Sequence, residues 1–193
     1  MSDVSHFDRV AAVYDWFAPT PSNAALRAGF SYARGPVESV LDVAGGTGRT
    51  AESLAEFDVT VLDASAGMLR EAEAKGLAVV RGDATRLPVV DGAVDAVTVT
   101  DALHHVPDAE AAVSEAARVL RPGGVLVVRE FDPRGLRGRV LVAAEHAVGF
   151  ESQFFAPGEL ADAFVEAGLR PSVVESGFEY ALVGRRGDEP VPR

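Results

Sequence analysis

Three acidic residues accompany three short apolar runs, and a turn with three glycines follows the first run. Asp42 lies in ESVLDV, Asp63 ends VTVLD and Asp83 follows LAVVRG. The glycine turn, residues 44–48, opens a helical pattern. Glycine removes the Cβ that would keep a ligand off the backbone, and a helix N-terminus attracts an anionic group such as a phosphate or a carboxylate. We therefore expect a bound molecule to lie against this turn.

The glycine turn by itself does not identify the ligand. Gly46, Gly48 and Ala51 also satisfy the dinucleotide fingerprint G-x-G-x-x-A, with Asp63 at the spacing of a ribose-binding acid. A glycine-rich turn without a ligand is a further alternative. The Asp42 carboxylate would repel a pyrophosphate but attract an ammonium group. Asp83 is placed to accept a hydrogen bond from an exocyclic amine.

Strands and helices alternate through the middle of the chain and position these acids. Strands are expected at 38–43, 59–63, 77–83, 94–101 and 124–131, and helices at 49–57, 66–76 and 109–120, with RPGG (121–124) stopping the last helix. Flanking elements are expected as helices at 4–17, 22–33, 137–149 and 157–167 and as strands at 171–176 and 178–184, before a frayed C-terminus. This alternation predicts β-α-β units and a parallel sheet covered on both faces.

The predicted fold is therefore α/β, a doubly wound, mostly parallel sheet with an antiparallel edge hairpin and an N-terminal helical lid. We expect one domain over residues 1–193. It comprises a lid (1–35), a ligand-binding core (36–131), and a substrate side with the C-terminal edge strands (132–193). Ligands of such sheets bind beyond the C-terminal ends of the strands, where the glycine turn lies.

The amino-acid composition makes some kinds of binding partner unfavourable and excludes some kinds of site. The 193 residues carry a formal net charge of −11, which makes nucleic acid and anionic lipid unfavourable partners. Cysteine is absent, which excludes disulfides and thiolate metal sites. Without a signal sequence or an apolar run of about 18 residues, we expect a cytoplasmic protein with no integral membrane association. The acidic surface suggests a salt-adapted (halophilic) protein; an acidic mesophilic protein is the alternative.

The motif LDVAGGTG, followed by GDATRLP and ARVLRPGGVLVV, resembles class I S-adenosylmethionine-dependent methyltransferases. Their motif reads D-x-G-x-G-x-G; Asp42, Gly46 and Gly48 match it, and Ala44 replaces its first glycine. The resemblance implies a Rossmann-like fold and S-adenosyl-L-methionine as cofactor. It implies that Asp42 helps to hold the ammonium side of the methionine end and that Asp63 accepts from the ribose hydroxyls.

The resemblance extends to further cofactor contacts. Asp83 and the backbone of Ala84 would frame the adenine, and Met68 is a candidate for apolar contact with its ring, with core packing as the alternative. Tyr14 lies in the leading helix, which could close over the cofactor or form a packed apolar stripe. The complete expected cofactor set is Tyr14, Asp42, Ala44, Gly45, Gly46, Thr47, Gly48, Asp63, Ala64, Met68, Asp83, Ala84, Thr100 and Asp101.

The segments FDRVAAVYD, VREFDP and ESQFFAPGELADAFVEAGL are similar to those of the ubiquinone/menaquinone biosynthesis C-methyltransferases. This similarity implies a small-molecule acceptor of a quinone type or another planar kind. The chain differs from that family at two places, both in segments expected to lie near the methyl acceptor. His104 and His105 stand where that family commonly carries an Arg-Asn pair, and the segment between REFDP and ESQFF is shorter than usual.

Candidate proton acceptors follow the fourth and fifth strands. His104 and His105 come just past the fourth, and Glu130 lies at the end of the fifth. Histidine takes a proton near neutral pH, although a surface or core role is the alternative for each. We expect no metal, because no further ligand stands at a useful spacing from the two histidines. Two rival functions remain, an NAD(P)-dependent oxidoreductase and a non-catalytic cofactor-binding protein; either a monomer or a homodimer is expected.

Overall fold

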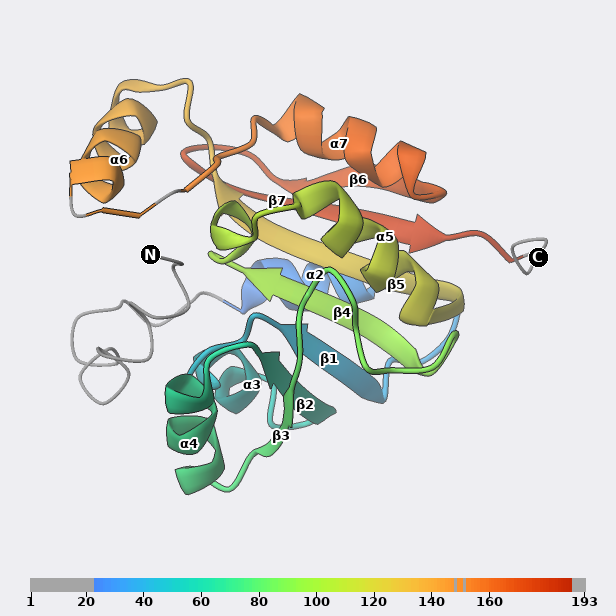
Figure 1. The fold of residues 1–193 in the computed structure, drawn as a ribbon. Coiled ribbons are helices and arrows are strands. Elements are labelled where there is room, and N and C mark those ends of the chain that lie inside the picture. The colour runs from blue at the N-terminus through green and yellow to red at the C-terminus, as the bar shows by residue number, and fades with distance from the viewer. Residues whose placement is uncertain (1–22, 148, 151, 189–193) are drawn as a thin grey trace.

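A seven-stranded sheet forms the centre of the molecule, in the order β3-β2-β1-β4-β5-β7-β6 (Figure 1). The computed structural model describes residues 23–147, 149–150 and 152–188. The strands are β1 (Ser39–Val43), β2 (Asp58–Asp63), β3 (Ala78–Arg81), β4 (Val94–Thr100), β5 (Leu120–Phe131), β6 (Leu169–Glu175) and β7 (Glu179–Arg186). The first five are parallel, and β7 runs antiparallel to β5 and β6. The predicted doubly wound sheet with an antiparallel edge is confirmed.

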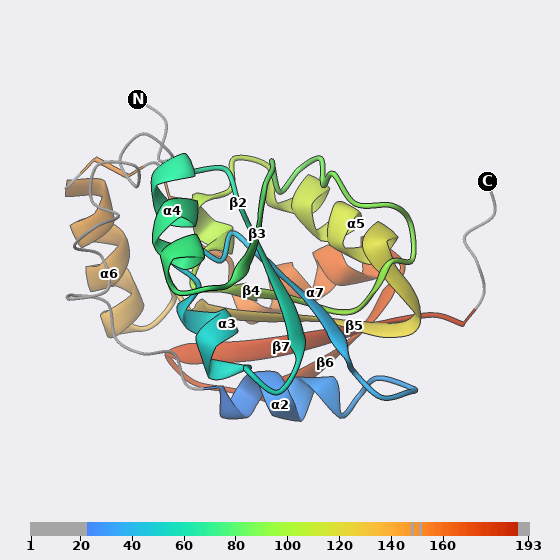
Figure 2. The same cartoon turned by 90° about the horizontal axis from the view of Figure 1, so that it is seen from below.

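Helices cover both faces of this sheet (Figures 1 and 2). They are α2 (Ala24–Phe30), α3 (Arg49–Ser53), α4 (Ala66–Ala74), the 3-10 helix η1 (Leu103–His105), α5 (Ala109–Val119), α6 (Leu136–Ala147) and α7 (Pro157–Glu166). Side chains alternate across a strand, so Val40 joins the buried cluster under α2, α3 and α4, while Leu41 and Val43 join the cluster under α5 and α7. Burial on both faces explains why the parallel strands read as continuous apolar runs.

The helix predicted at 22–33 is α2, and it packs on the sheet rather than over the strand ends. A Cβ added to Gly29 would lie 2.6 Å from Val127 Cγ2, so the helix backbone lies directly on β5. The prediction of a lid is therefore wrong for α2. The other predicted lid helix, 4–17, lies outside the described residues, as does the C-terminal end from residue 189.

Two other boundaries differ from the predictions. Helix α3 ends at Ser53 instead of residue 57, because the chain must turn so that Asp58 N–H can donate to Glu38 C=O and begin β2. RPGG does not separate a helix from a strand, since β5 starts at Leu120 directly after α5. The pairing jumps from Val94–Leu120 to Ala96–Val125, so this segment forms a bulge within the strand.

Helix α6 lies apart from the two helical layers, on the side where the parallel strands end (Figure 1). Gly138 is its one buried residue, and Leu136 and Val140 are exposed. Among the helices that the structure describes, none combines the length and apolarity needed to cross a bilayer.

Candidate functional site

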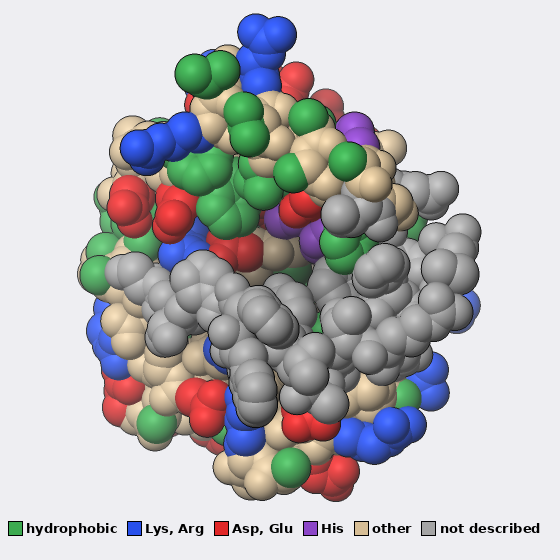
Figure 3. All heavy atoms as spheres, turned by 90° about the vertical axis from the view of Figure 1, so that its left-hand side faces the viewer, with side chains coloured by type: hydrophobic (Ala, Val, Ile, Leu, Met, Phe, Trp, Pro, Cys, Tyr) green, Lys and Arg blue, Asp and Glu red, His purple; other side chains and the backbone are tan. Residues whose placement is uncertain are grey.

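A cavity of about 420 Å³ lies beyond the C-terminal ends of β1, β2, β3 and β4. Histidine and acidic side chains meet in the hollow at the centre of this side of the molecule (Figure 3). Eleven of the predicted cofactor residues line the cavity: Ala44, Gly45, Gly46, Thr47, Asp63, Ala64, Met68, Asp83, Ala84, Thr100 and Asp101. The prediction that the strand ends share one binding region therefore agrees with the structure.

Ten further described residues line the cavity and were not predicted to do so. They are Arg49, Thr50, Leu62, Ser65, Gly82, Thr85, Ala102, Val106, Pro107 and Asp108. Each lies in or close beside a segment that the analysis had singled out, so position after a strand was the signal that could have found them. The final three belong to the loop after η1, whose path depends on packing against the rest of the fold.

Two of the predicted cofactor residues lie behind the wall, and one cannot be placed. Asp42 is fully buried beneath the glycine turn. Gly48 is the N-cap of α3, with a left-handed backbone (φ 80°), and a Cβ there would lie 2.2 Å from Leu77 Cδ1. Its glycine is therefore explained by helix packing. Tyr14 lies outside the described residues.

Two residues of the cavity wall have a backbone conformation that non-glycine residues rarely adopt. In the described part of the chain, Ala44 (φ 53°) and Asp101 (φ 52°) are the non-glycine residues with positive φ, and both line the cavity. This conformation costs an L-residue about 1–2 kcal/mol. Strain of this kind persists where surrounding structure imposes it, commonly at binding sites.

The Asp63 carboxylate fixes the two sides of the cavity to each other. Gly46 N–H donates to its Oδ2 at 2.9 Å, and Ser65 N–H donates to its Oδ1 at 2.8 Å. The Ser65 hydroxyl in turn accepts from Met68 N–H at 3.1 Å and caps α4. The glycine turn, the end of β2 and the start of α4 are thus held in register around one carboxylate.

Asp42 supports the turn from below. Its Oδ1 accepts from the Thr98 hydroxyl at 2.8 Å, and its Oδ2 has no hydrogen-bond partner among the described residues. Burial raises the pKa of the Asp42 carboxyl from 3.8 to about 7. A Cβ on Gly45 would lie 2.5 Å from Oδ2, so the carboxylate occupies the space that another side chain at position 45 would need. The expected contact of Asp42 with an ammonium group stays a prediction.

We expect Gly45→Ala to destabilise the protein by about 1–3 kcal/mol, the usual range for overpacking a filled site. The added methyl group must displace the Asp42 carboxylate, which has little room to move. Thermal unfolding measures the loss. Gly35→Ala is the matched control, because a Cβ at Gly35 meets no described atom within 4 Å. Equal melting temperatures for Gly45→Ala and the wild type would show that Asp42 is not packed under the turn.

The buried Asp42 carboxyl also makes the free energy of unfolding depend on pH. Between about pH 4 and pH 7 the unfolded chain loses this proton while the folded chain keeps it, so stability falls as pH rises through that window. Asp42→Asn keeps an oxygen acceptor for Thr98 and removes the titration. We expect its advantage over the wild type in urea unfolding to grow from pH 4.5 to pH 8, approaching roughly 4 kcal/mol. A difference independent of pH would contradict the raised pKa.

Two buried polar atoms on the cavity wall lack partners. Thr100 Oγ1 and Asp101 Oδ1 make no hydrogen bond to any described residue. The other Asp101 oxygen pairs with Arg129, whose guanidinium also lies 3.2 Å from Glu179. Burial raises the pKa of Asp101, and the Arg129 charge opposes that rise. Unpaired buried polar groups are unfavourable, so these atoms are suited to meet polar groups of a ligand.

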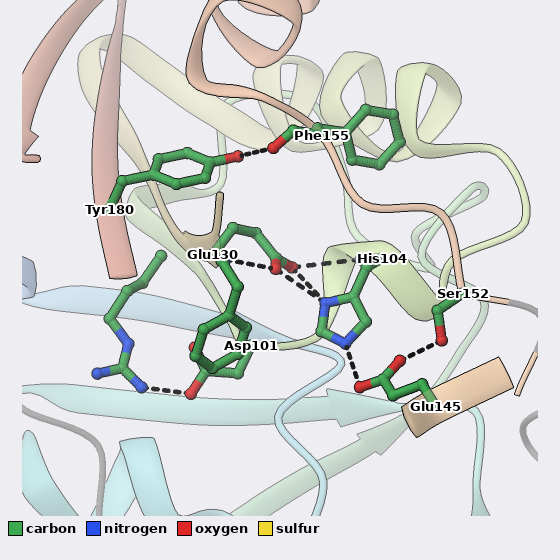
Figure 4. A network of polar contacts seen from close by, with 9 residues as sticks. Asp101, His104, Glu130, Glu145, Ser152, Phe155 and Tyr180 are labelled. Atoms are coloured by element: carbon green, nitrogen blue, oxygen red, sulfur yellow. Dashed lines mark hydrogen bonds and ion pairs between the residues drawn. The ribbon is translucent and has the colours of Figure 1, made fainter. Parts of the chain in front are cut away.

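The three predicted catalytic residues separate into one wall residue and a buried pair. His105 lines the cavity. His104 is 3 % exposed and Glu130 is 1 % exposed, and neither lines it. The His104 Nδ1 atom lies 2.8 Å and 2.9 Å from the two Glu130 oxygens (Figure 4). Burial lowers the pKa of His104, but the Glu130 and Glu145 carboxylates outweigh that effect and raise it to about 10.

Comparison with known proteins identifies the segment that forms this cavity. Residues 41–128 match the family described as Methyltransferase domain. A demethylmenaquinone methyltransferase of Beutenbergia cavernae is 51 % identical over 100 residues, which are 50 % of this chain and 42 % of that protein. The demethylmenaquinone methyltransferase of Mycolicibacterium paratuberculosis is 46 % identical over 99 residues, covering 50 % of this chain and 43 % of its own length. Each match thus spans less than half of the relative.

Solved structures share the fold over nearly the whole chain. A SAM-dependent methyltransferase from Thermotoga maritima has a TM-score of 0.76 at 23 % identity, covering 95 % of this chain and 99 % of that one. The [4+2]-cyclase SpnF has a TM-score of 0.72 at 17 % identity, covering 97 % of this chain and 96 % of its own. The resemblance to class I methyltransferases and the Rossmann-like methyltransferase fold are confirmed.

Proposed function

We propose that this chain binds S-adenosyl-L-methionine in the cavity and transfers its methyl group to a small-molecule acceptor. This proposal rests mainly on the agreement between two residue ranges, that of the cavity wall and that of the family match. Every described residue of the cavity wall lies between positions 44 and 108, and the segment matching the Methyltransferase domain family runs from 41 to 128. The segment that matches the family therefore contains this wall.

The charge of the wall supports a cationic ligand. Among the described residues, four aspartates line the cavity, namely Asp63, Asp83, Asp108 and the Arg129-paired Asp101, against one arginine, Arg49. Opposite charges attract in a partly enclosed site, so this wall favours a sulfonium with an ammonium group over the two negative charges of a pyrophosphate. The balance of charge argues against the NAD(P)-dependent alternative. The volume of about 420 Å³ lies in the range of small-molecule sites.

Different wall residues would hold different parts of the cofactor. The Asp63 carboxylate, fixed by two backbone N–H groups, is placed to accept from ribose hydroxyls. The Asp83 carboxylate is held by Thr85, whose N–H and hydroxyl both donate to Oδ1 at 2.8 Å. It stands where an adenine amine would donate. The buried oxygens of Thr100 and Asp101, which have no partner among the described residues, would be available for further polar contacts.

Bound S-adenosylmethionine supplies an activated methyl group, which leaves sulfur as the acceptor's electron pair forms the new bond. The chain's contribution is alignment and exclusion of water around that displacement. His105, the cavity-lining member of the three predicted catalytic residues, is placed to take the acceptor's proton. The named relatives methylate demethylmenaquinone, which supports a quinone-type or other planar acceptor for this chain.

Calorimetric titration with S-adenosylhomocysteine and with NADH tests the choice of cofactor. We expect saturable binding of one equivalent of S-adenosylhomocysteine and none of NADH. Binding of NADH alone would overturn the proposal. Because a protein with this fold is described as a [4+2]-cyclase, fold alone does not fix the reaction. Transfer of a labelled methyl group to a compound in cell extract separates the enzyme from a non-catalytic binding protein.

A further inference from the structure

His104, His105 and Glu145 come together at the edge of the cavity from two separate segments. The histidines form the end of η1, and Glu145 reaches them from α6. One donor atom from each of the three residues lies within 4.8 Å of the others. This group could not be expected from spacing along the chain, because Glu145 stands about forty residues beyond the histidines and the packing of α6 was not predicted.

The spacing of two donors suits an ion between them. His104 Nε2 lies 3.6 Å from Glu145 Oε1, which is longer than a hydrogen bond (Figure 4). Two ligands at about 2.1 Å from one tetrahedral ion are about 3.4 Å apart. His105 supplies the third ligand atom, which lies within 4.8 Å of those of His104 and Glu145.

The two donors are oriented by partners outside the group. Glu130 accepts from His104 Nδ1, so the other ring nitrogen, Nε2, faces Glu145, and a metal ion bound there would take the place of the Nε2 proton. The Ser152 hydroxyl donates to the other Glu145 oxygen, Oε2. A carboxylate on the distal nitrogen of a ligating histidine is the arrangement that fixes tautomer and ring orientation at metal centres. Glu130 and Glu145 face the two nitrogens of one imidazole, so an ion at Nε2 would lie between His104 and a carboxylate.

Aromatic rings pack against both histidines of the group. Phe154 stacks on the His104 ring with centroids 4.3 Å apart and planes at 12°, and Phe150 lies 4.9 Å from the His105 ring. Gln153 N–H donates to His104 C=O at 2.7 Å, and the Tyr180 hydroxyl donates to Phe155 C=O at 2.8 Å. The first bond joins the 152–155 segment to η1 and the second joins it to β7, so the segment covers one side of the group while His105 borders the cavity.

We propose that His104, His105 and Glu145 form a binding site for a divalent first-row transition-metal ion. Two imidazoles and one carboxylate favour Zn²⁺ or a similar ion over Mg²⁺, which prefers oxygen ligands. Three protein ligands leave a coordination position open, as in catalytic rather than structural zinc sites. With an ion bound, His105 is a ligand and cannot also accept a proton, so metal-loaded and metal-free protein differ in the role of this residue.

Equilibrium dialysis of the chelator-treated, full-length chain against Zn²⁺, and separately against Mg²⁺, tests the site without depending on methyl transfer. We expect one tightly held Zn²⁺ and no comparable Mg²⁺. Glu145→Gln and His105→Gln should each weaken Zn²⁺ binding at least tenfold. Glu166→Gln, which removes an exposed carboxylate from α7, should bind as the wild type does.

Folding of each variant is checked by circular dichroism, and S-adenosylhomocysteine affinity is measured in parallel. Glu145 does not line the cavity, so Glu145→Gln should lose Zn²⁺ and keep the nucleoside. Absence of one-equivalent Zn²⁺ binding would overturn the metal proposal, as would equal binding by the wild type and both variants. Loss of nucleoside binding by the wild type would instead count against the proposed function, so the two failures are distinguishable.

Discussion

Asp63→Ala is expected to raise the dissociation constant for S-adenosylhomocysteine about 100-fold or more. The carboxylate is placed to accept from the ribose, and hydrogen bonds to a charged group contribute about 1.5–3 kcal/mol each. Its removal also frees Gly46 N–H and Ser65 N–H, which it holds at 2.9 Å and 2.8 Å. The glycine turn and the start of α4 then lose their common acceptor.

Two variants make the measurement specific. Asp63→Asn keeps one oxygen acceptor and no charge, so its affinity should fall between those of the wild type and Asp63→Ala. Asp58→Ala removes an exposed carboxylate from the opposite end of the same strand and should leave the affinity unchanged. Isothermal titration calorimetry supplies the constants. An Asp63→Ala protein that folds normally and binds as tightly as the wild type would contradict the ribose assignment.

His105→Ala is expected to reduce the turnover of the methyl acceptor by about 10²–10⁴-fold, the range that general acid–base catalysis supplies. Cofactor affinity should change little, because the loss concerns proton removal from the acceptor. The expectation depends on His105 lining the cavity while His104 and Glu130 lie behind it. Turnover is measured with labelled S-adenosylmethionine, and affinity with S-adenosylhomocysteine.

His146→Ala is the matched control, since it removes an exposed imidazole from the neighbouring helix α6. It should leave both measurements near the wild-type values. If His105→Ala weakens cofactor binding by the same factor as turnover, the residue supports the cavity and does not take part in proton transfer. Comparing chelated with Zn²⁺-loaded protein then separates its role as a base from its role as a metal ligand.

Local patterns predicted the features that depend on neighbouring residues. The continuous apolar runs gave β1, β2 and β4, and the glycine turn gave the start of α3, because each pattern follows from burial or backbone freedom within a few residues. The position of Asp63 at the end of its strand sufficed to place it at the cavity. Parallel strands all end at one edge of the sheet, so a cavity there was expected before any tertiary contact was known.

Features that depend on distant contacts were not predictable in this way. Asp42 precedes the last residue of β1 and Asp63 is the last residue of β2, and the first is buried beneath Gly45 while the second reaches the cavity. Which of His104 and His105 faces the cavity depends on Glu130 and on how η1 packs. The approach of Glu145 requires the placement of α6, whose sequence lacks a strong apolar face. Salt adaptation, location and oligomeric state stay predictions from composition alone.

A crystal structure grown with S-adenosylhomocysteine tests whether the cavity binds the nucleoside. We expect the nucleoside in the cavity beyond β1, β2 and β3, with the ribose hydroxyls within hydrogen-bond distance of the Asp63 carboxylate. Its amino-acid end should lie against residues 44–47, and its adenine beside Asp83. A nucleoside bound elsewhere, or a cavity that stays closed to it at saturating concentration, would contradict the account.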